Sequence, residues 1–96
     1  MEILITYDVA TDTPDGSRRL RRVAKACEAY GQRVQKSVFE CIVTAAELEQ
    51  FKHRLLSEVD LAEDSLRIYR LTEPRDRHVQ VFGRQPAFDL HDPLVL

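Results

Sequence analysis

The spacing of apolar residues along the first third of the chain predicts a strand followed by a helix. Residues 2–9 alternate like a half-buried strand, with one side formed by Ile3, Ile5, Tyr7 and Val9 and the other by Leu4, Thr6 and Asp8. Residues 10–16 hold a proline, a glycine and two aspartates, which are typical of a turn. Residues 17–30 carry apolar side chains at helical spacing, with Ser17 as the expected N-cap and Gly31 as the expected left-handed residue after the helix.

The rest of the chain predicts two strands, a second helix and two further strands. Residues 32–43 are rich in β-forming residues but long for one strand, so we expect two strands that break near Lys36 and Ser37. Thr44 to Glu47 match a capping box, and the helix that follows has an apolar stripe formed by Leu48, Phe51, Leu55 and Val59. Residues 65–72 and 78–82 are the last predicted strands.

This order of elements, β-α-β-β-α-β with an extra C-terminal strand, is that of a ferredoxin-like α+β domain. We expect residues 1–83 to form this domain, with an antiparallel sheet and both helices on one face. A chain of 96 residues is the size of one domain. Residues 84–96 end in a short apolar run, and we expect this tail to dock on a dimer mate or on another partner.

The second face of the predicted sheet needs a cover. Two helices can cover only one face, yet Leu4 lies on the side opposite Ile3 and Ile5, and residues 32–43 are apolar on both sides. A second copy of the same sheet is the simplest cover. We therefore expect a homodimer.

Composition disfavours several classes of protein. No apolar stretch approaches the ~20 residues of a membrane span, and the run at residues 3–5 is too short for a signal peptide, so we expect a cytoplasmic protein without a membrane partner. Cys27 and Cys41 are isolated and are expected to be buried and reduced. The three histidines are scattered, which disfavours a zinc site, and no P-loop or G-x-S-x-G pattern is present.

Positive charge is concentrated in the segment from Ser17 to Lys36. This segment has a net charge of +6, so the remainder of a chain with a total charge of −2 carries −8. Four of its basic residues share one helix surface at i, i+3, i+4 and i+7 spacing: Arg18, Arg21, Arg22 and Lys25. A solvated helix face would normally mix signs, because like charges four residues apart repel. The alternative, a phosphate-binding surface, agrees with the single sign and with the preference of arginine for phosphate.

Asp8 is the residue that most directly suggests chemistry. It is a carboxylate at the end of an apolar strand, on the face expected to form the dimer interface. It could simply cap the turn that follows. A two-fold axis would instead bring two Asp8 side chains together, and a hard divalent cation such as Mg²⁺ or Mn²⁺ would relieve their repulsion.

Three motifs, in order and at these separations, resemble the CRISPR-associated Cas-two family. They are Tyr7-Asp8-Val9, the RRLRRVAK run at residues 18–25 and the YGQRVQKSVFEC run at residues 30–41. Residues 78–83 also resemble the last strand of the family. The resemblance extends from residue 3 to about residue 83, and the family supplies the smaller of the two core spacer-acquisition proteins.

The resemblance implies a homodimer whose sheets face each other, with Asp8 as a metal-linked acid near the two-fold axis. Members of the family are described as metal-dependent endonucleases that act on RNA or on double-stranded DNA, and as the central bridge of an integrase that contains a larger Cas-one subunit. By position, the implied nucleic-acid-binding residues are Arg18, Arg19, Arg21, Arg22, Lys25, Arg33, Ser37 and Phe39, with Tyr7 in support. From the residues alone, Tyr7 and Phe39 are more simply core or interface aromatics, with base stacking as the alternative.

Two functions of different classes are therefore expected from the sequence. The first is a Mg²⁺-dependent endonuclease in which Asp8 is the catalytic residue, the Asp8 pair holds Mg²⁺ (or Mn²⁺) and water attacks the phosphorus of a phosphodiester. The alternative is a non-catalytic scaffold that bridges DNA in the spacer-integration complex. A toxin-like ribonuclease is a third possibility, which is supported by fold analogy alone.

Overall fold

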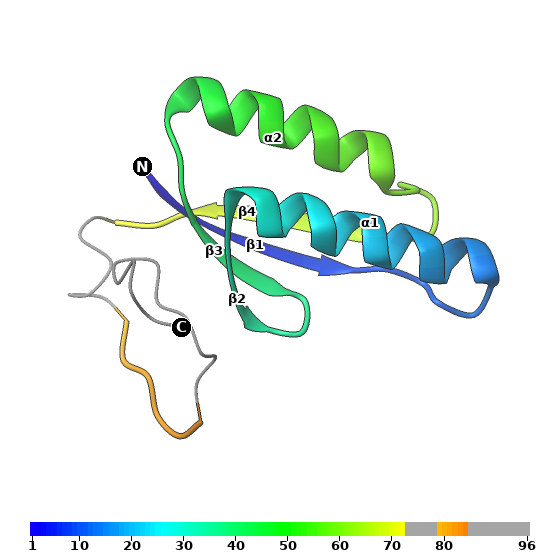
Figure 1. The fold of residues 1–96 in the computed structure, drawn as a ribbon, viewed down its shortest axis with the longest axis horizontal. Helices are drawn as coiled ribbons and strands as arrows, with labels where there is room; N and C mark the ends of the chain where they lie inside the picture. Colours follow the sequence, from blue (N-terminus) through cyan, green and yellow to red (C-terminus); the bar gives the residue numbers. More distant parts are fainter. Residues whose placement is uncertain (73–78, 85–96) are drawn as a thin grey trace.

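The computed structural model describes residues 1–72 and 79–84 and has six regular elements within them (Figure 1). In chain order these are β1 (Glu2–Asp8), α1 (Pro14–Tyr30), β2 (Gly31–Gln35), β3 (Val38–Ile42), α2 (Ala45–Glu58) and β4 (Ser65–Arg70). The strands form one antiparallel sheet in the order β2-β3-β1-β4, and both helices cover the same face. The prediction of a ferredoxin-like α+β fold is confirmed.

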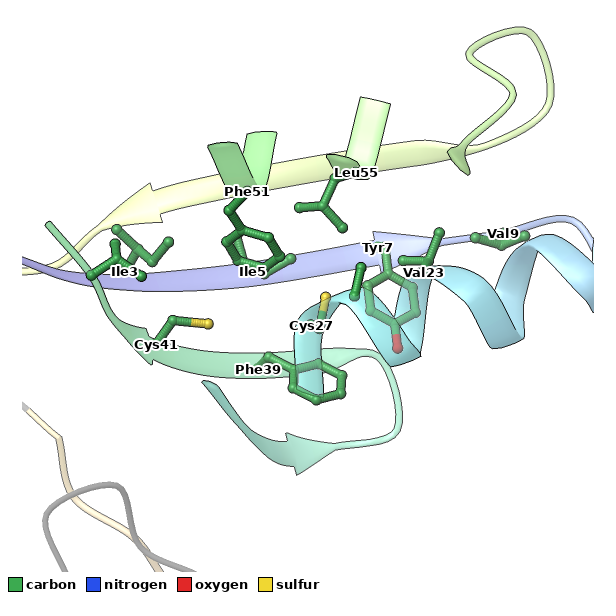
Figure 2. Packing of buried hydrophobic residues seen from close by; sticks show 12 residues of the cluster. Ile3, Ile5, Tyr7, Val9, Val23, Cys27, Phe39, Cys41, Phe51 and Leu55 are labelled. Carbon is green, nitrogen blue, oxygen red and sulfur yellow. The ribbon is translucent and has the colours of Figure 1, made fainter. Parts of the chain in front are cut away.

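Strand β1 alternates between the two faces of the sheet as predicted. Ile3 and Ile5 lie opposite Cys41 and Phe39 of β3, and all four side chains are fully buried beneath the helices. Figure 2 shows these side chains in one cluster with residues that the helices contribute, namely Val23, Cys27, Phe51 and Leu55. This cluster is the hydrophobic core.

Cys27 and Cys41 are buried and free, as expected. Burial in apolar surroundings raises the pKa of each thiol to about 12. Neither thiol is therefore a reactive thiolate near neutral pH.

Helix α1 begins three residues earlier than predicted. Thr13, not Ser17, is the N-cap, and its hydroxyl oxygen accepts a hydrogen bond from the Gly16 amide at 3.1 Å. Pro14 occupies the first helical position, where its fixed φ suits a helix and its missing N–H costs nothing. Ser17 lies inside the first turn, and its amide donates to the Thr13 carbonyl at 3.1 Å. The prediction failed because the proline was assigned to a turn.

Gly31 is extended, so the prediction of a left-handed conformation was wrong. Its φ of −161° and ψ of −159° place it in the first position of β2, directly after the helix. A Cβ atom here would lie 2.3 Å from Cys41 Sγ and 2.4 Å from the Glu40 carbonyl oxygen. Glycine is required here because β2 and β3 approach each other closely, and not because the backbone is left-handed.

Most of the other predicted elements agree with the structure. The strands break at the turn of residues 36–37, and Thr44 forms the complete capping box with Glu47. Residues 79–84 contain no strand, so the extra strand expected over residues 78–82 is not formed in its described part. Residue 78 and tail residues 85–96 lie outside the described residues.

No helix in the described part of the chain is long and apolar enough to span a bilayer.

The sheet face opposite the helices, here called the open face, carries both apolar and polar side chains. Pairing registers assign to this face Leu4, Thr6 and Asp8 of β1, Val38, Glu40 and Ile42 of β3, and Ser65, Arg67 and Tyr69 of β4. Ile42 and Tyr69 are 44% and 41% exposed, respectively. The apolar positions expected on the second face are therefore present, among charged neighbours.

Candidate nucleic-acid interface

Asp8 is the last residue of β1 and is exposed on the open face. It lies opposite Ser65 of β4, while the preceding residue, Tyr7, points into the core. Within residues 1–72 and 79–84, no group of three or more histidine, cysteine, aspartate or glutamate side chains could hold a metal ion. In the described part of the chain, Asp8 is therefore not part of a complete set of such ligands, and a cation bound there would take further oxygen ligands, such as water or phosphate oxygens.

The basic side chains of α1 form one surface, as predicted. Arg18, Arg21, Arg22 and Lys25 line a shallow hollow on this helix. Arg18 forms an ion pair with Asp15, and Arg22 Nε lies 2.8 Å from Glu58 Oε2 of α2. Arg21 and Lys25 are exposed and have no acidic partner within the described residues. These four residues are here called the basic face.

Arg19 has a different environment from the basic face. Its guanidinium donates two hydrogen bonds to Asp64, from Nε to Oδ2 at 2.9 Å and from Nη2 to Oδ1 at 3.2 Å. The Asp64 side chain is completely buried and that of Arg19 is 14% exposed. In this structure Arg19 therefore links α1 to Asp64, and its guanidinium is not free to bind phosphate as the family resemblance implied.

The Asp64 carboxylate is fully satisfied by its donors. The Ala10 amide donates to Oδ1 at 3.1 Å and the Asp60 amide donates to Oδ2 at 2.8 Å. The hydrogen bond from Arg19 is the main reason that the pKa of Asp64 is lowered from 3.8 to about 2. Asp64 is therefore ionised throughout the neutral pH range.

Phe39 and Tyr7 belong to the core rather than to an exposed stacking surface. Phe39 is completely buried, and its ring stacks on that of Tyr7 with a centroid distance of 6.2 Å. The exposed Arg33 guanidinium lies over the Phe39 ring, 5.1 Å from the centroid, as a cation–π contact. The Phe39 ring thus packs beneath the Arg33 guanidinium, and because it is buried it cannot itself stack on a base in this conformation.

The turn between β2 and β3 lies at the Asp8 end of the sheet. The Tyr7 amide donates to the Ser37 carbonyl at 3.2 Å, and the Tyr7 hydroxyl donates to the Lys36 carbonyl at 3.3 Å. Burial raises the pKa of the Tyr7 hydroxyl, which remains protonated at neutral pH. The structure thus places Ser37 near Asp8 through a contact with the preceding residue.

Two residues near this site were not singled out from the sequence. Asp64 is one of several acids after α2, and nothing in the sequence distinguishes it from Asp60 or Glu63. Arg67 lies opposite Thr6 on the open face, and its Nη1 donates to the Tyr69 hydroxyl at 3.0 Å. Asp64 contacts Ala10 and Arg19, and Arg67 lies opposite Thr6 of β1. These contacts join segments that are far apart in the sequence, so the local pattern does not predict them.

A model of the family described as CRISPR associated protein Cas2 matches residues 1–79. The chain belongs to this family. The motif resemblance seen in the sequence is thereby confirmed.

Curated Cas2 relatives match over nearly their whole length. The chain is 57% identical over 96 residues to the CRISPR-associated endoribonuclease Cas2 1 of Moorella thermoacetica, which covers 100% of both chains. It is 54% identical over 95 residues to the CRISPR-associated endonuclease Cas2 of Halalkalibacterium halodurans, which covers 99% of both. The Cas2 family therefore includes relatives named for activity on RNA and relatives named as endonucleases without that restriction.

Solved Cas2 structures share the fold. The crystal structure of Streptococcus pyogenes Cas2 at pH 6.5 superposes with a TM-score of 0.79 at 54% identity, and covers 86% of this chain and 100% of that one. A Thermus thermophilus protein, TT1823, gives a TM-score of 0.73 at 34% identity, with 88% and 93% coverage. The similarity thus extends over most of the described domain.

The environment of Asp64 predicts a pH-dependent contribution to stability. Replacing Asp64 with Asn should lower the free energy of unfolding at pH 7 by about 1.5–3 kcal/mol, because charged hydrogen bonds are lost and a buried donor is left unpaired. The folded-state pKa is depressed, so the contribution is present above the ordinary value of 3.8 and is lost as pH falls through about 2.

Urea unfolding from pH 7 down to pH 2 would measure this difference. Asp60→Asn is the matched control, since among residues 1–72 and 79–84 the exposed Asp60 side chain accepts only from the Ala62 amide, at 3.0 Å. A difference between wild type and Asp64→Asn that stays constant over this pH range would contradict the assignment.

Proposed function

We propose that the chain is a metal-dependent endonuclease of the CRISPR adaptation system, which acts as a homodimer on RNA or double-stranded DNA. The observation that carries the proposal is the exposed Asp8 carboxylate at the end of β1, which five residues separate from a helix with a single-sign basic face. An acid that can bind a metal ion and cations that can bind phosphate are both used in metal-assisted phosphodiester hydrolysis. The relatives named as endonucleases support the same activity class.

The homodimer is proposed to form through the open face. Ile42 and Tyr69 are large exposed side chains on this face, and Leu4 and Val38 lie between the polar positions. An isologous interface between two copies would cover these apolar residues and repeat each contact across the two-fold axis. Asp8 lies on the same face, so the axis would relate two Asp8 carboxylates.

A pair of Asp8 carboxylates fits a hard divalent cation. Asp8 of one copy supplies one carboxylate, and Mg²⁺ or Mn²⁺ is commonly held by one or two carboxylates together with water and phosphate oxygens. Such an ion, when bound, would neutralise phosphate charge and favour ionisation of a water ligand. The ligands from this protein would be Asp8 of each copy.

The basic face is proposed to bind the phosphate backbone. Arg21 and Lys25 have no acidic partner within the described residues, so a phosphate meets no competing carboxylate there. The ion pairs of Arg18 and Arg22 involve cations that are more than half exposed, and such pairs contribute little to stability. Phosphate can therefore replace Asp15 or Glu58 at small cost.

The role of Asp8 is tested by its isosteric amide. Asp8→Asn should reduce cleavage of RNA or duplex DNA by at least about 100-fold in a Mg²⁺ titration, because several kcal/mol of charge stabilisation are lost. Asp12→Asn, which changes an exposed acid in the following loop, should cleave like wild type. Cleavage at the wild-type rate by a purified, folded Asp8→Asn protein would contradict the proposal that the chain is an enzyme.

A second proposed function is that of a DNA-bridging scaffold, which would act with the larger Cas-one subunit of an integrase. Two observations favour it: the described residues contain no three-ligand acidic cluster, and the basic face does not depend on Asp8. Under this alternative, spacer acquisition would depend on the basic face and would survive Asp8→Asn.

Both functions predict that the basic face determines how salt affects binding. The double change Arg21→Gln and Lys25→Gln should weaken duplex DNA binding and reduce the slope of log affinity against log salt by about 2, because each phosphate contact releases about one counterion. The control is Lys52→Gln with Arg54→Gln on α2, which removes the same charge from residues outside the basic face. Equal salt slopes for the two double variants would contradict the assignment.

A further inference from the structure

Asp64 joins three segments that are far apart in the sequence. Its carboxylate binds the guanidinium of Arg19 in α1, the amide of Ala10 in the connection that follows β1, and the amide of Asp60 after α2. All of these bonds lie between 2.8 and 3.2 Å, and the Asp64 side chain is completely buried. Removing a carboxylate from water is costly unless its lone pairs are satisfied, as they are here.

Ala10 is also held from the side of the helix. A Cβ atom on Gly16 would lie 1.8 Å from the Ala10 carbonyl oxygen, so α1 packs directly on this backbone. The Gly16 amide in turn donates to the Thr13 cap at the start of the helix. Ala10 therefore has its N–H bound by Asp64 and its carbonyl packed against Gly16, two residues after Asp8.

We infer that Asp64 is a positioning residue, which acts through Ala10 and Arg19 to hold the Asp8 end of β1 in a fixed place relative to the basic face of α1. The inference rests on the proposed function, because it concerns the geometry between the acid and the phosphate-binding helix. Residues 9–13 form the connection between β1 and α1 and contain no helix or strand. Without the Asp64 bonds, this connection would keep the packing of Val9, the contact between Ala10 and Gly16 and the Thr13 cap, but the Ala10 amide would lose its carboxylate acceptor.

A positioning role makes a different prediction from a purely structural one. If Asp64 only stabilises the fold, its loss lowers the melting temperature but leaves the turnover of the folded fraction unchanged. If it positions Asp8, the folded variant should turn over more slowly, since small displacements of a reacting group are costly. Substrate affinity should change little, because Arg21 and Lys25 do not contact Asp64.

The experiment compares wild type, Asp64→Asn and Asp60→Asn at a temperature at which circular dichroism shows each to be folded. For Asp64→Asn we expect kcat for RNA or duplex DNA cleavage to fall by about 10- to 100-fold with KM unchanged within about twofold. Hydrogen exchange at the Ala10 amide should become faster by at least about tenfold, as its acceptor is weakened. Asp60→Asn should match wild type in all three measurements.

A folded Asp64→Asn protein with wild-type kcat would overturn the inference, as would a change confined to KM. Should Asp64→Asn fail to fold, Arg19→Lys takes its place, because it leaves the Asp64 carboxylate and its two amide bonds intact while it removes the second guanidinium bond. The same reduction in kcat supports positioning, and a wild-type kcat overturns it.

The proposed function is contradicted by different results from those that test Asp64: no cleavage by wild type, or cleavage by Asp8→Asn at the wild-type rate. The Ala10 amide then decides the inference without reference to cleavage. Faster exchange in Asp64→Asn than in Asp60→Asn supports the positioning of the β1 end, and equal exchange overturns it.

Discussion

The pairing register of strand β1 determines both the hydrophobic core and the position of the candidate site. This strand pairs with β3 on one side and with β4 on the other, so its alternation determines which face every neighbouring residue occupies. Ile3 and Ile5 must face the helices to complete the core, and the same alternation turns Asp8 outward at the strand end. A shift of one residue would bury the carboxylate and expose the isoleucines. Core packing and the candidate site are therefore set by one pairing.

The arginines of α1 have different roles, which depend on the acidic side chain, if any, that each of them contacts. Arg19 reaches Asp64 in a buried, doubly hydrogen-bonded pair, whereas Arg18 and Arg22 form ion pairs at the surface. Arg21 and Lys25 meet no acid among the described residues. One helix therefore combines a structural cation with a cationic surface, and only the surface is suited to a polyanion.

Local pattern was sufficient for the six elements of the described fold and for the position of Asp8 at the end of a strand. Alternation in β1, the break near Lys36 and the capping box at Thr44 are all encoded within a few residues, and each agrees with the structure. Thr13 was missed as an N-cap because Pro14 suits both a turn and a first helical position. Gly31 was misassigned because its requirement is a close approach to Cys41, a contact that local sequence cannot reveal. Asp64 escaped notice for the same reason, since its partners lie 45 and 54 residues away.

Two copies of the chain are proposed to build one site from their Asp8 carboxylates, and this shared site underlies the proposed nuclease function. It is tested most directly by cleavage measured on mixed dimers, prepared by dissociating and reassociating wild-type and Asp8→Asn chains in varied proportions. If both carboxylates are needed, mixed dimers are inactive and activity falls as the square of the wild-type fraction, to about a quarter in an equal mixture. A linear fall, to about half in that mixture, would show that each copy acts alone and would contradict the shared site.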